Sequence, residues 1–430
     1  MMKNITSIVT ILLMCSAFIV SCSDDDNNEE FQRTPHDPNS PIELSTFYPD
    51  SGGIATKIIL KGKNLGIDAD RLKIYFNEKP GKVIESTGDL VYGIVPKQPG
   101  DMCTVSLVHD GDSIVYDNKF KYITQINVST IAGSPGANDI KDGSLAEAWL
   151  PQPRYICVDD EKNIFVTQIH WHTMTQINEE KNQVVTLMRK NGLTYPNAPC
   201  VAPDQSVIVP LDGGNTFYQF DPQTQWSPRK VNPQVKSGTE NFTITYKHSL
   251  ALRYSTGMLY TRAYDGKLAK INPVTKEREL VDIDLLPGSD SFLQFDPKDD
   301  KMLYISYAAK HCIYTYNVET GEHELFAGEQ NVPGYIDGER DFTRFNNPHQ
   351  LCFDEDGNIY VADTKNHCIR KIDKKGIVSA VVGVPQISGY VDGDPEVAMF
   401  KQPYGVAIDK DGIIYVADTG NKCVRKLAIE

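Results

Sequence analysis

The sequence predicts an all-β protein in which a small antiparallel sandwich precedes an array of six repeated β units. The clearest observation is that two segments, residues 345–372 and 400–427, share one order of strand, Asp-Gly turn, strand, polar turn and strand without a gap. Gly357 and Gly412 supply the positive φ of the tight turns. A unit of this kind cannot bury both of its faces alone, so we expect it to stack against copies of itself.

The connectors before these units repeat as well. Residues 128–153, 323–348 and 378–403 each place a Gly after a short strand, then an Asp-Gly pair, then a closing Pro. Together with the repeated units, this pattern resembles the NHL repeat family, whose members form β-propellers. The resemblance implies an NHL-type propeller with six blades over residues 124–430.

Aligning the units on their second strand assigns every part of the array to a blade. The spacing between units suits blades of four strands with connectors of variable length. The strand at residues 126–132 precedes the first inner strand, so we expect it to close the C-terminal blade and to remove two exposed sheet edges. The inner strands are expected near Arg154, Ala198, His248, Ser291, His349 and Tyr404, and the second strands contain Phe165, Ile208, Tyr260, Tyr304, Tyr360 and Tyr415.

The sandwich is expected at residues 41–123, where short alternating apolar runs are separated by Gly, Pro, Asp and Asn. The order of residues in 47–66 resembles the IPT/TIG immunoglobulin-like domain. The resemblance implies a spacer or docking module without catalytic residues.

The N-terminus is typical of an exported protein. Lys3 precedes an apolar run at residues 8–20 that is too short to span a bilayer, so residues 1–21 are interpreted as a signal peptide. Ser21 and Cys22 resemble the bacterial lipobox, in which the Cys is acylated. Residues 22–40 then read as an acidic tether and linker.

The acidic tract at residues 23–30 resembles the surface-export signal of lipoproteins from glycan-degrading Gram-negative bacteria. A plain solvated tether is the alternative interpretation. We therefore expect an outer-membrane lipoprotein at the cell surface, with a periplasm-facing anchor as the alternative, and membrane contact through the lipid alone.

Charge and cysteine content narrow the function classes. The formal charge of −14 argues against a nucleic-acid partner, which would need a basic face. Equivalent positions in neighbouring blades are too far apart for disulfides, so the cysteines beyond the lipobox are predicted to be small core residues. These are Cys103, Cys157, Cys200, Cys312, Cys352, Cys368 and Cys423.

A ligand site is predicted at the mouth of the central channel, where propellers usually place one. The loops that enter the inner strands would line it. The predicted residues are Arg154, Tyr155, His248, Ser291, His349, Gln350 and Tyr404.

His248 and His349 occupy the same repeat position two blades apart. They resemble residues of peptidyl-α-hydroxyglycine amidating lyase, an NHL-type propeller that holds a metal with His residues around the channel. A Zn or Ca ion is the candidate cofactor that this resemblance implies. Arg154 stands in the remaining alternate blade, however, and its cation repels a metal. A channel lined by His and Arg that bond water or each other is therefore favoured.

A second enzyme family, the six-bladed lactonases with a carboxylate-rich calcium centre, would need an acidic residue where the first blade opens. Arg154 and Tyr155 stand there instead. No cofactor is firmly predicted, and binding is favoured over catalysis.

The loop after the second strand of the first blade departs most from the repeat, because His170, Trp171 and His172 replace the polar turn of the last two blades. An exposed Trp could stack on a sugar ring; packing on the adjacent blade is the alternative. Trp149 and Trp226 are interpreted as structural.

The sequence thus predicts a surface-anchored lipoprotein whose propeller binds a carbohydrate at the channel mouth. A metal-dependent hydrolase or lyase centred on His248 and His349 is one alternative. A scaffold that docks protein partners at the cell surface is the other.

Overall fold

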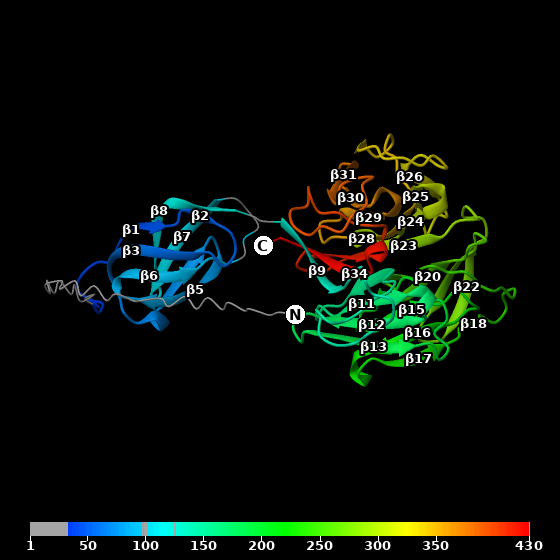
Figure 1. Ribbon diagram of the computed structural model, residues 1–430, viewed down its shortest axis with the longest axis horizontal. Helices are drawn as coiled ribbons and strands as arrows, with labels where there is room; N and C mark the ends of the chain where they lie inside the picture. The colour runs from blue at the N-terminus through cyan, green and yellow to red at the C-terminus, as the bar shows by residue number, and fades with distance from the viewer. Residues whose placement is uncertain (1–32, 97, 99–101, 124–125, 430) are drawn as a thin grey trace, which may run out of the picture. The chain divides into compact units, whose positions relative to one another are not determined.

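A computed structural model describes residues 33–96, 98, 102–123 and 126–429 (Figure 1). These residues form two compact units, one before residue 124 and one from residue 126 on. Both units are built of strands joined by turns and short 3-10 helices, which confirms the predicted fold class. The signal peptide and Cys22 lie outside the described residues.

The first unit is an immunoglobulin-like sandwich. Its strands are hydrogen-bonded in the order β1-β3-β6-β5-β4-β7-β8-β2 and wrap around one hydrophobic core that includes Phe47, Ile74 and Phe120. The strands are β1 (Glu43–Tyr48), β2 (Ser51–Gly52), β3 (Lys57–Gly66), β4 (Leu72–Phe76), β5 (Lys79–Ser86), β6 (Gly88–Ile94), β7 (Met102–His109) and β8 (Asp112–Tyr122), with η1 (Ala69–Arg71) before β4.

Residues 34–40, expected to be part of the tether, are bonded to this sandwich. The Asn64 side chain accepts the N–H of Asp37 at 2.7 Å and donates to the carbonyls of Asp37 and Ser40 at 2.9 and 2.7 Å. The N–H of Thr34 donates to the Thr87 carbonyl at 3.0 Å. Composition could not indicate this packing, because the partners are distant in sequence.

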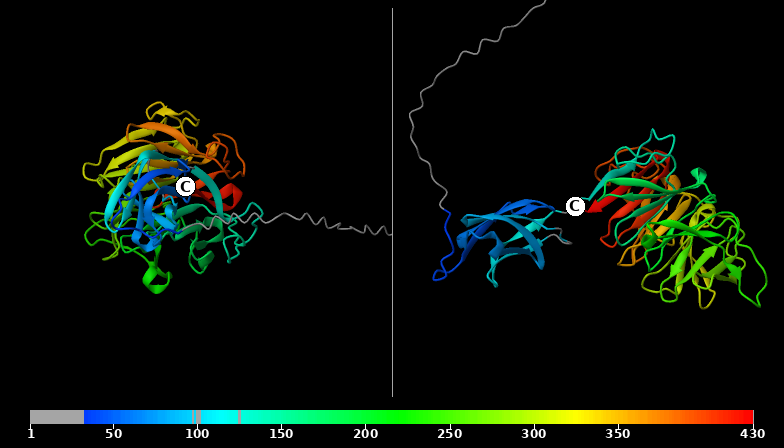
Figure 2. Two further views of the ribbon diagram at one scale, coloured as in Figure 1. Left: turned by 90° about the vertical axis from the view of Figure 1, so that its left-hand side faces the viewer. Right: turned by 90° about the horizontal axis from the view of Figure 1, so that it is seen from below.

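The second unit is a propeller of six sheets, as predicted. Figure 2 shows the sheets set around a common centre. The inner strands β10, β14, β19, β23, β28 and β32 follow one another around the channel. Blade 1 contains β10 (Tyr155–Val158), β11 (Ile164–Gln168), η2 (Ile169–Trp171), β12 (Thr173–Asn178) and β13 (Gln183–Arg189); blade 2 contains β14 (Cys200–Val201), β15 (Val207–Pro210), β16 (Phe217–Asp221), η3 (Pro222–Thr224) and β17 (Ser227–Val231).

The other four blades follow the same plan. Blade 3 contains β18 (Gln234–Val235), β19 (Ala251–Arg253), β20 (Met258–Arg262), β21 (Leu268–Asn272) and β22 (Glu277–Asp282); blade 4 contains β23 (Ser291–Phe295), β24 (Met302–Tyr307), η4 (Ala308–Lys310), β25 (Cys312–Asn317) and β26 (His323–Gly328). Blade 5 contains β27 (Gly338–Glu339), β28 (Pro348–Phe353), β29 (Ile359–Asp363), η5 (Thr364–Asn366), β30 (Cys368–Ile372) and β31 (Ile377–Val382); blade 6 contains β32 (Pro403–Ile408), β33 (Ile414–Asp418), η6 (Thr419–Asn421), β34 (Cys423–Ile429) and β9 (Ile126–Gly133).

β9 completes blade 6 from the other end of the propeller chain. It runs antiparallel to β34 in a register that extends from Gly133 opposite Cys423 to Ile126 opposite Ile429. The two strands lie side by side in Figures 1 and 2, in cyan and red. Hydrogen bonds between the first and last strands therefore close the ring.

Neighbouring blades share hydrophobic cores. Ile156 and Val166 of blade 1, for example, pack in one cluster with Tyr415 and Val424 of blade 6. Corresponding clusters lie between the other adjacent pairs of blades. Each buried side chain of this size contributes about 1.5–3 kcal/mol, so each blade depends on both neighbours. The seven described cysteines are free thiols; five are buried, as predicted, whereas Cys200 and Cys352 are partly buried.

The propeller has two faces, which we name by the direction of the inner strands. The inner strands begin on the entry face, where the second strands end because each pair is antiparallel. The inner strands end on the exit face, which also carries the turns between the third and fourth strands.

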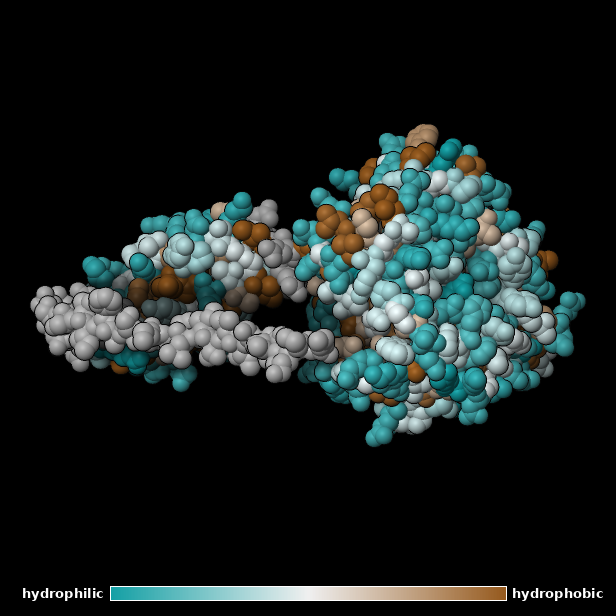
Figure 3. Space-filling view, viewed as in Figure 1, coloured by the Kyte–Doolittle hydropathy of each residue, from teal (hydrophilic) through white to brown (hydrophobic). Residues whose placement is uncertain are grey.

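The view in Figure 3 shows a propeller surface that is mainly hydrophilic, with hydrophobic residues in separate small groups. Within the described ranges, no helix has the length and apolar character needed to cross a bilayer.

Candidate ligand site at the channel mouth

Aromatic side chains from different blades converge where the inner strands begin. Phe292 of blade 4 lies 4.9 Å from the ring of Tyr155, 5.3 Å from His349 and 6.3 Å from His248, measured between ring centroids. Tyr404 of blade 6 lies 4.3 Å from His349. Blades 1, 3, 4, 5 and 6 thus contribute to one cluster, and the structure brings together most of the residues predicted to line the mouth.

Arg154 places a cation on this cluster. Its guanidinium carbon lies 4.3 Å from the centre of the Tyr404 ring and 5.6 Å from that of Tyr155. Among the described residues, Arg154 forms no ion pair, and its buried Nε and the buried Nδ1 of His248 have no hydrogen-bond partner. Buried polar atoms of this kind usually bond something, so the mouth has unused capacity for a polar ligand or water.

Two carboxylates adjoin His248. Its Nε2 lies 3.3 Å from Asp290 Oδ1. Burial lowers the pKa of His248, although the charges of Asp290 and Asp212 oppose this shift. Burial also raises the pKa of Asp212, whose Oδ1 accepts a hydrogen bond from the amide of Asn197. A neutral imidazole beside carboxylates offers both donors and acceptors to a ligand.

Lys247 anchors the loop that carries His248. Its ammonium group is buried and donates to the carbonyls of Leu211 and Gly214. Burial lowers the pKa of Lys247 to about 7, with Asp212 acting in the opposite direction.

His349 is held in a neutral state. Its Nδ1 lies 2.9 Å from both the Asn347 carbonyl and the Thr364 hydroxyl. Burial, followed by the charge of Arg154, lowers the pKa of His349 to about 3. In the described part of the chain, no group of three or more His, Cys, Asp or Glu side chains is arranged to hold a metal ion.

Two predicted mouth residues have their polar groups occupied by the fold. The Gln350 amide accepts the N–H of Ile156 at 3.1 Å and donates to its carbonyl at 2.6 Å, which ties blade 5 to blade 1 across the channel. Ser291 accepts a hydrogen bond from Arg262 at 3.1 Å. Gly405 is required nearby, because a Cβ there would lie 2.9 Å from Gln350 Oε1.

The His-Trp-His loop lies on the entry face of blade 1, outside the aromatic cluster. Trp171 is half-buried, with the Arg189 guanidinium 5.5 Å from its ring. His170 is exposed. His172 Nδ1 accepts the N–H of Tyr195 in blade 2 at 3.0 Å, and burial lowers its pKa. His172 thus joins two blades.

This contact recurs elsewhere in the ring. His311 Nδ1 accepts the N–H of Asn347 and His367 Nδ1 accepts that of Gln402, both at 3.0 Å. Like His172, both histidines have a left-handed backbone and follow the second strand's short 3-10 turn. We call these three side chains the histidine latches.

Sequence reasoning missed three exposed tyrosines at this mouth, which we call the tyrosine rim. Tyr195, Tyr246 and Tyr264 are 45%, 60% and 43% exposed. The Tyr246 N–H donates to the Asp212 carbonyl at 2.7 Å, and the Tyr264 ring lies 6.4 Å from that of His248. Tyr195 and Tyr246 lie in the loops that enter the inner strands of blades 2 and 3, and Tyr264 follows the second strand of blade 3. These repeat positions could have indicated that the three tyrosines lie on the entry face.

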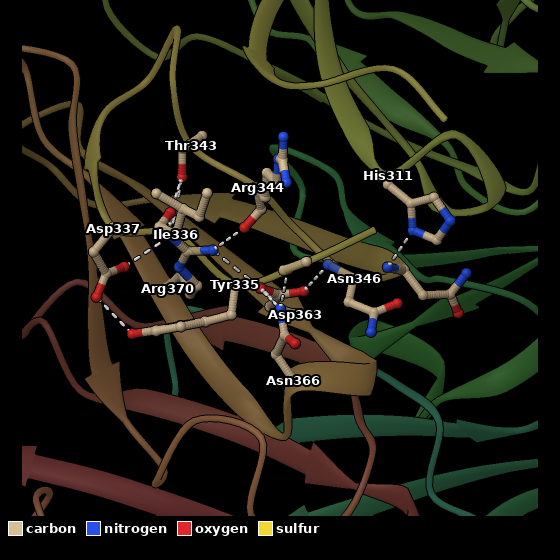
Figure 4. A network of polar contacts seen from close by, with 12 residues as sticks. His311, Tyr335, Ile336, Asp337, Thr343, Arg344, Asn346, Asp363, Asn366 and Arg370 are labelled. Carbon is tan, nitrogen blue, oxygen red and sulfur yellow. Dashed lines mark hydrogen bonds and ion pairs between the residues drawn. The ribbon is translucent and has the colours of Figure 1, made fainter. Parts of the chain in front are cut away.

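In blades 5 and 6 the end of the second strand lies in a buried ion-pair network, and Figure 4 shows the network of blade 5. Arg370 bonds Asp363 at 3.2 Å and Asp337 at 2.7 Å, and Asn366 donates to Asp363 at 2.7 Å. In blade 6, Arg425 pairs in the same way with Asp418 and Asp392. The Asp, Asn and Arg of the repeat are thus used to hold the connector against its blade.

Comparisons with known proteins agree with this architecture. The NHL repeat model matches residues 345–372 and 400–427, and the IPT/TIG domain model matches residues 42–122. The chain therefore contains NHL repeats and an IPT/TIG domain, and its second unit is a six-bladed propeller of the NHL type.

Among curated proteins, the chain is similar to Suppressor of quenching 1, chloroplastic, of Arabidopsis thaliana. The two are 25% identical over 320 residues, which cover 68% of this chain and 26% of that protein. The chain thus spans about a quarter of that relative's length.

Two solved structures match nearly the whole described chain. A Bacteroides thetaiotaomicron protein of unknown function has a TM-score of 0.70 and 28% identity, covering 92% of this chain and 100% of its own. An auxiliary nutrient binding protein from Bacteroides ovatus has a TM-score of 0.69 and 23% identity, with the same coverage.

Proposed function

We propose that the propeller binds a carbohydrate at the entry-face mouth of its channel. The observation that carries this proposal is the pair of buried polar atoms without a hydrogen-bond partner among the described residues, Arg154 Nε and His248 Nδ1, beside the exposed ring of Tyr264, which lies 6.4 Å from that of His248. Exposed aromatic rings around a polar centre suit a sugar, whose ring faces are apolar and whose hydroxyls both donate and accept hydrogen bonds.

The fold supports the same function class. The Bacteroides ovatus neighbour is an auxiliary nutrient binding protein, and it shares this two-unit architecture over its whole length. We infer that this chain serves nutrient capture and that acylation of Cys22 anchors it at the outer membrane, facing outward.

Affinity electrophoresis of the full mature chain in gels containing starch, xylan, mannan or pectin tests this proposal. We expect retardation in at least one gel, with dissociation constants raised roughly tenfold by Arg154→Ala or Tyr246→Ala, because each removes a contact worth about 1–2 kcal/mol. Lys365→Ala is the control for loss of an exposed cation, since Lys365 is exposed in the 3-10 turn after the second strand of blade 5. Equal mobility in every gel, or retardation that neither mouth variant weakens, would refute the proposal.

A further inference from the structure

A groove of about 790 Å³ lies between blades 1 and 2 on the exit face, away from the channel mouth. One wall comes from residues 159–163 and 176–187 of blade 1. The other comes from residues 204–205 and 222–226 of blade 2. The fold uses this space for neither ring closure nor the channel cluster.

Trp226 provides an aromatic surface in the groove. It is half-buried, and its ring packs on Phe165 of blade 1 at 4.6 Å with an interplanar angle of 58°. The N–H of Trp226 donates to the Asp221 carbonyl at 2.9 Å, which holds the turn. Of the three tryptophans, Trp149 and Trp171 each have a cationic side chain near the ring, whereas none lies over Trp226 among the described residues.

Amide side chains line the same groove. Asn163 Oδ1 accepts hydrogen bonds from Asn178 at 2.7 Å and Gln176 at 3.1 Å, and its own amide donates to Asp159 at 2.8 Å. This connected set forms a rigid polar wall. A fixed wall lowers the entropy lost when a ligand binds.

Three further glutamines line the groove closer to solvent. Gln183, Gln223 and Gln225 are exposed, and in the described part of the chain their side-chain amides bond no other residue. Each amide offers two donors and one carbonyl acceptor. The groove therefore combines an aromatic surface with neutral amides that match hydroxyls, and its lining also includes the charged residues Asp159, Glu161, Lys181 and Asp204.

The corresponding groove between blades 4 and 5 has a different chemistry. Its volume is about 470 Å³, and its lining includes Lys298, Arg340, Lys374, Asp356 and Asp373. Two aromatic residues, Tyr304 and Phe326, also line it, and Phe326 has the Arg340 guanidinium 4.6 Å from its ring. Within the described residues, the groove between blades 4 and 5 thus lacks the amide side chains that line the groove between blades 1 and 2.

We propose that the groove between blades 1 and 2 is a second binding site, on the opposite face from the channel mouth, for a neutral oligosaccharide segment. A pyranose ring stacks on Trp226, and its hydroxyls bond the amides of Gln183, Gln223 and Gln225. This site stands independently of the channel-mouth site, since it shares no residue with it.

Isothermal titration of the full mature chain with malto-, cello-, xylo- and mannooligosaccharides tests the groove. We expect Trp226→Ala to weaken binding of the groove's ligand roughly tenfold or more, and Gln183→Ala/Gln225→Ala to weaken it several-fold. Lys374→Ala, an exposed residue of the groove between blades 4 and 5, is the control and should leave this affinity unchanged, and Arg154→Ala is measured beside it to report on the channel mouth.

The glutamine variant keeps the test decisive if Trp226→Ala fails to fold, because Gln183 and Gln225 are exposed and make no packing contact that the core needs. Absence of binding by every oligosaccharide at millimolar concentration would overturn the proposal. Binding that the glutamine variant leaves unchanged would overturn it too. Loss caused by Arg154→Ala alone would assign the ligand to the channel mouth and also overturn it.

Discussion

Blades 5 and 6 differ from blades 1 and 3 in what stands at the end of the second strand. Asp363 and Asp418 occupy this position in the blades that match the NHL model, and each pairs with a buried arginine. Gln168 takes the position in blade 1 and Arg262 in blade 3. The repeat residues hold the connectors of blades 5 and 6, whereas blades 1 and 3, which have other residues at this position, carry the buried polar atoms at the mouth that lack a partner among the described residues.

Gln168 of blade 1 and Arg262 of blade 3 still form part of the hydrogen bonds that the Asp and Arg of the repeat form in blades 5 and 6. Gln168 Oε1 accepts the N–H of Gln152 at 3.0 Å, as Asp363 Oδ1 accepts that of Asn346 at 2.7 Å. Arg262 bonds the carbonyls of Leu285 and Ser289 without a carboxylate partner. A blade can therefore leave the repeat pattern and keep its connector in place.

The largest effect is expected from opening the ring. A fragment that begins at residue 134 lacks β9, whereas one that begins at residue 126 retains it. We expect the shorter fragment to lose cooperative unfolding in urea, because it exposes the edge of β34 and loses the buried Val128 and Ile131. The longer fragment is the control, and equal unfolding midpoints for the two would contradict closure by β9.

The next largest loss of folding stability is expected when one of the buried ion-pair networks of blades 5 and 6 is broken. Asp363→Ala leaves the Arg370 cation buried with one acidic partner fewer, so we expect a loss of about 3–5 kcal/mol in the free energy of unfolding. Arg154→Ala should cost about 1–2 kcal/mol, since it removes two aromatic contacts and no ion pair. Urea denaturation measures the free energy of unfolding of both variants. Similar losses for Asp363→Ala and Arg154→Ala would contradict the claim that the network residue stabilises the fold more than the mouth residue does.

A smaller effect concerns the histidine latches, which occur in both groups of blades. Burial lowers the pKa of His172, His311 and His367, so the unfolded chain binds more protons than the folded chain as pH falls below about 6.5. The stabilisation by each latch is therefore present above that pH and is lost progressively below it.

The measurement is the free energy lost on His367→Ala, which should be smaller at pH 5 than at pH 7. Lys422 holds the corresponding position in blade 6 and bonds the Ala137 carbonyl at 2.6 Å, so Lys422→Ala is the control and should cost the same at both pH values. A loss for His367→Ala that does not change with pH would count against the latch.

The fold could be predicted from the sequence because the turn residues and the repeated strands recur at regular spacing along the chain. The Asp-Gly turns, the repeated glycines and the two close NHL copies fixed the class, and both predicted domain types are confirmed. Gly383 shows why a glycine recurs after the outer strand: a Cβ there would lie 2.7 Å from the His367 carbonyl.

The site was predicted less completely. Position in the repeat placed Arg154, Tyr155, His248, His349 and Tyr404 together at the mouth, although their binding role stays a prediction. The sequence pattern could not show that the polar groups of Gln350 and Ser291 are hydrogen-bonded to residues of other blades. It also could not show that Trp226 lines a groove, since that depends on how two blades meet.

Hydrogen–deuterium exchange of the full mature chain, with and without saturating malto-, cello-, xylo- or mannooligosaccharide, tests the central claim most directly. The account predicts added protection at residues 193–198, 244–250 and 286–293, on the entry face of the diverged blades. Residues 359–372 and 414–427, in the repeat-like blades, should exchange at unchanged rates. Protection confined to those last two segments, or none with any oligosaccharide, would contradict the claim that departures from the repeat mark the binding site.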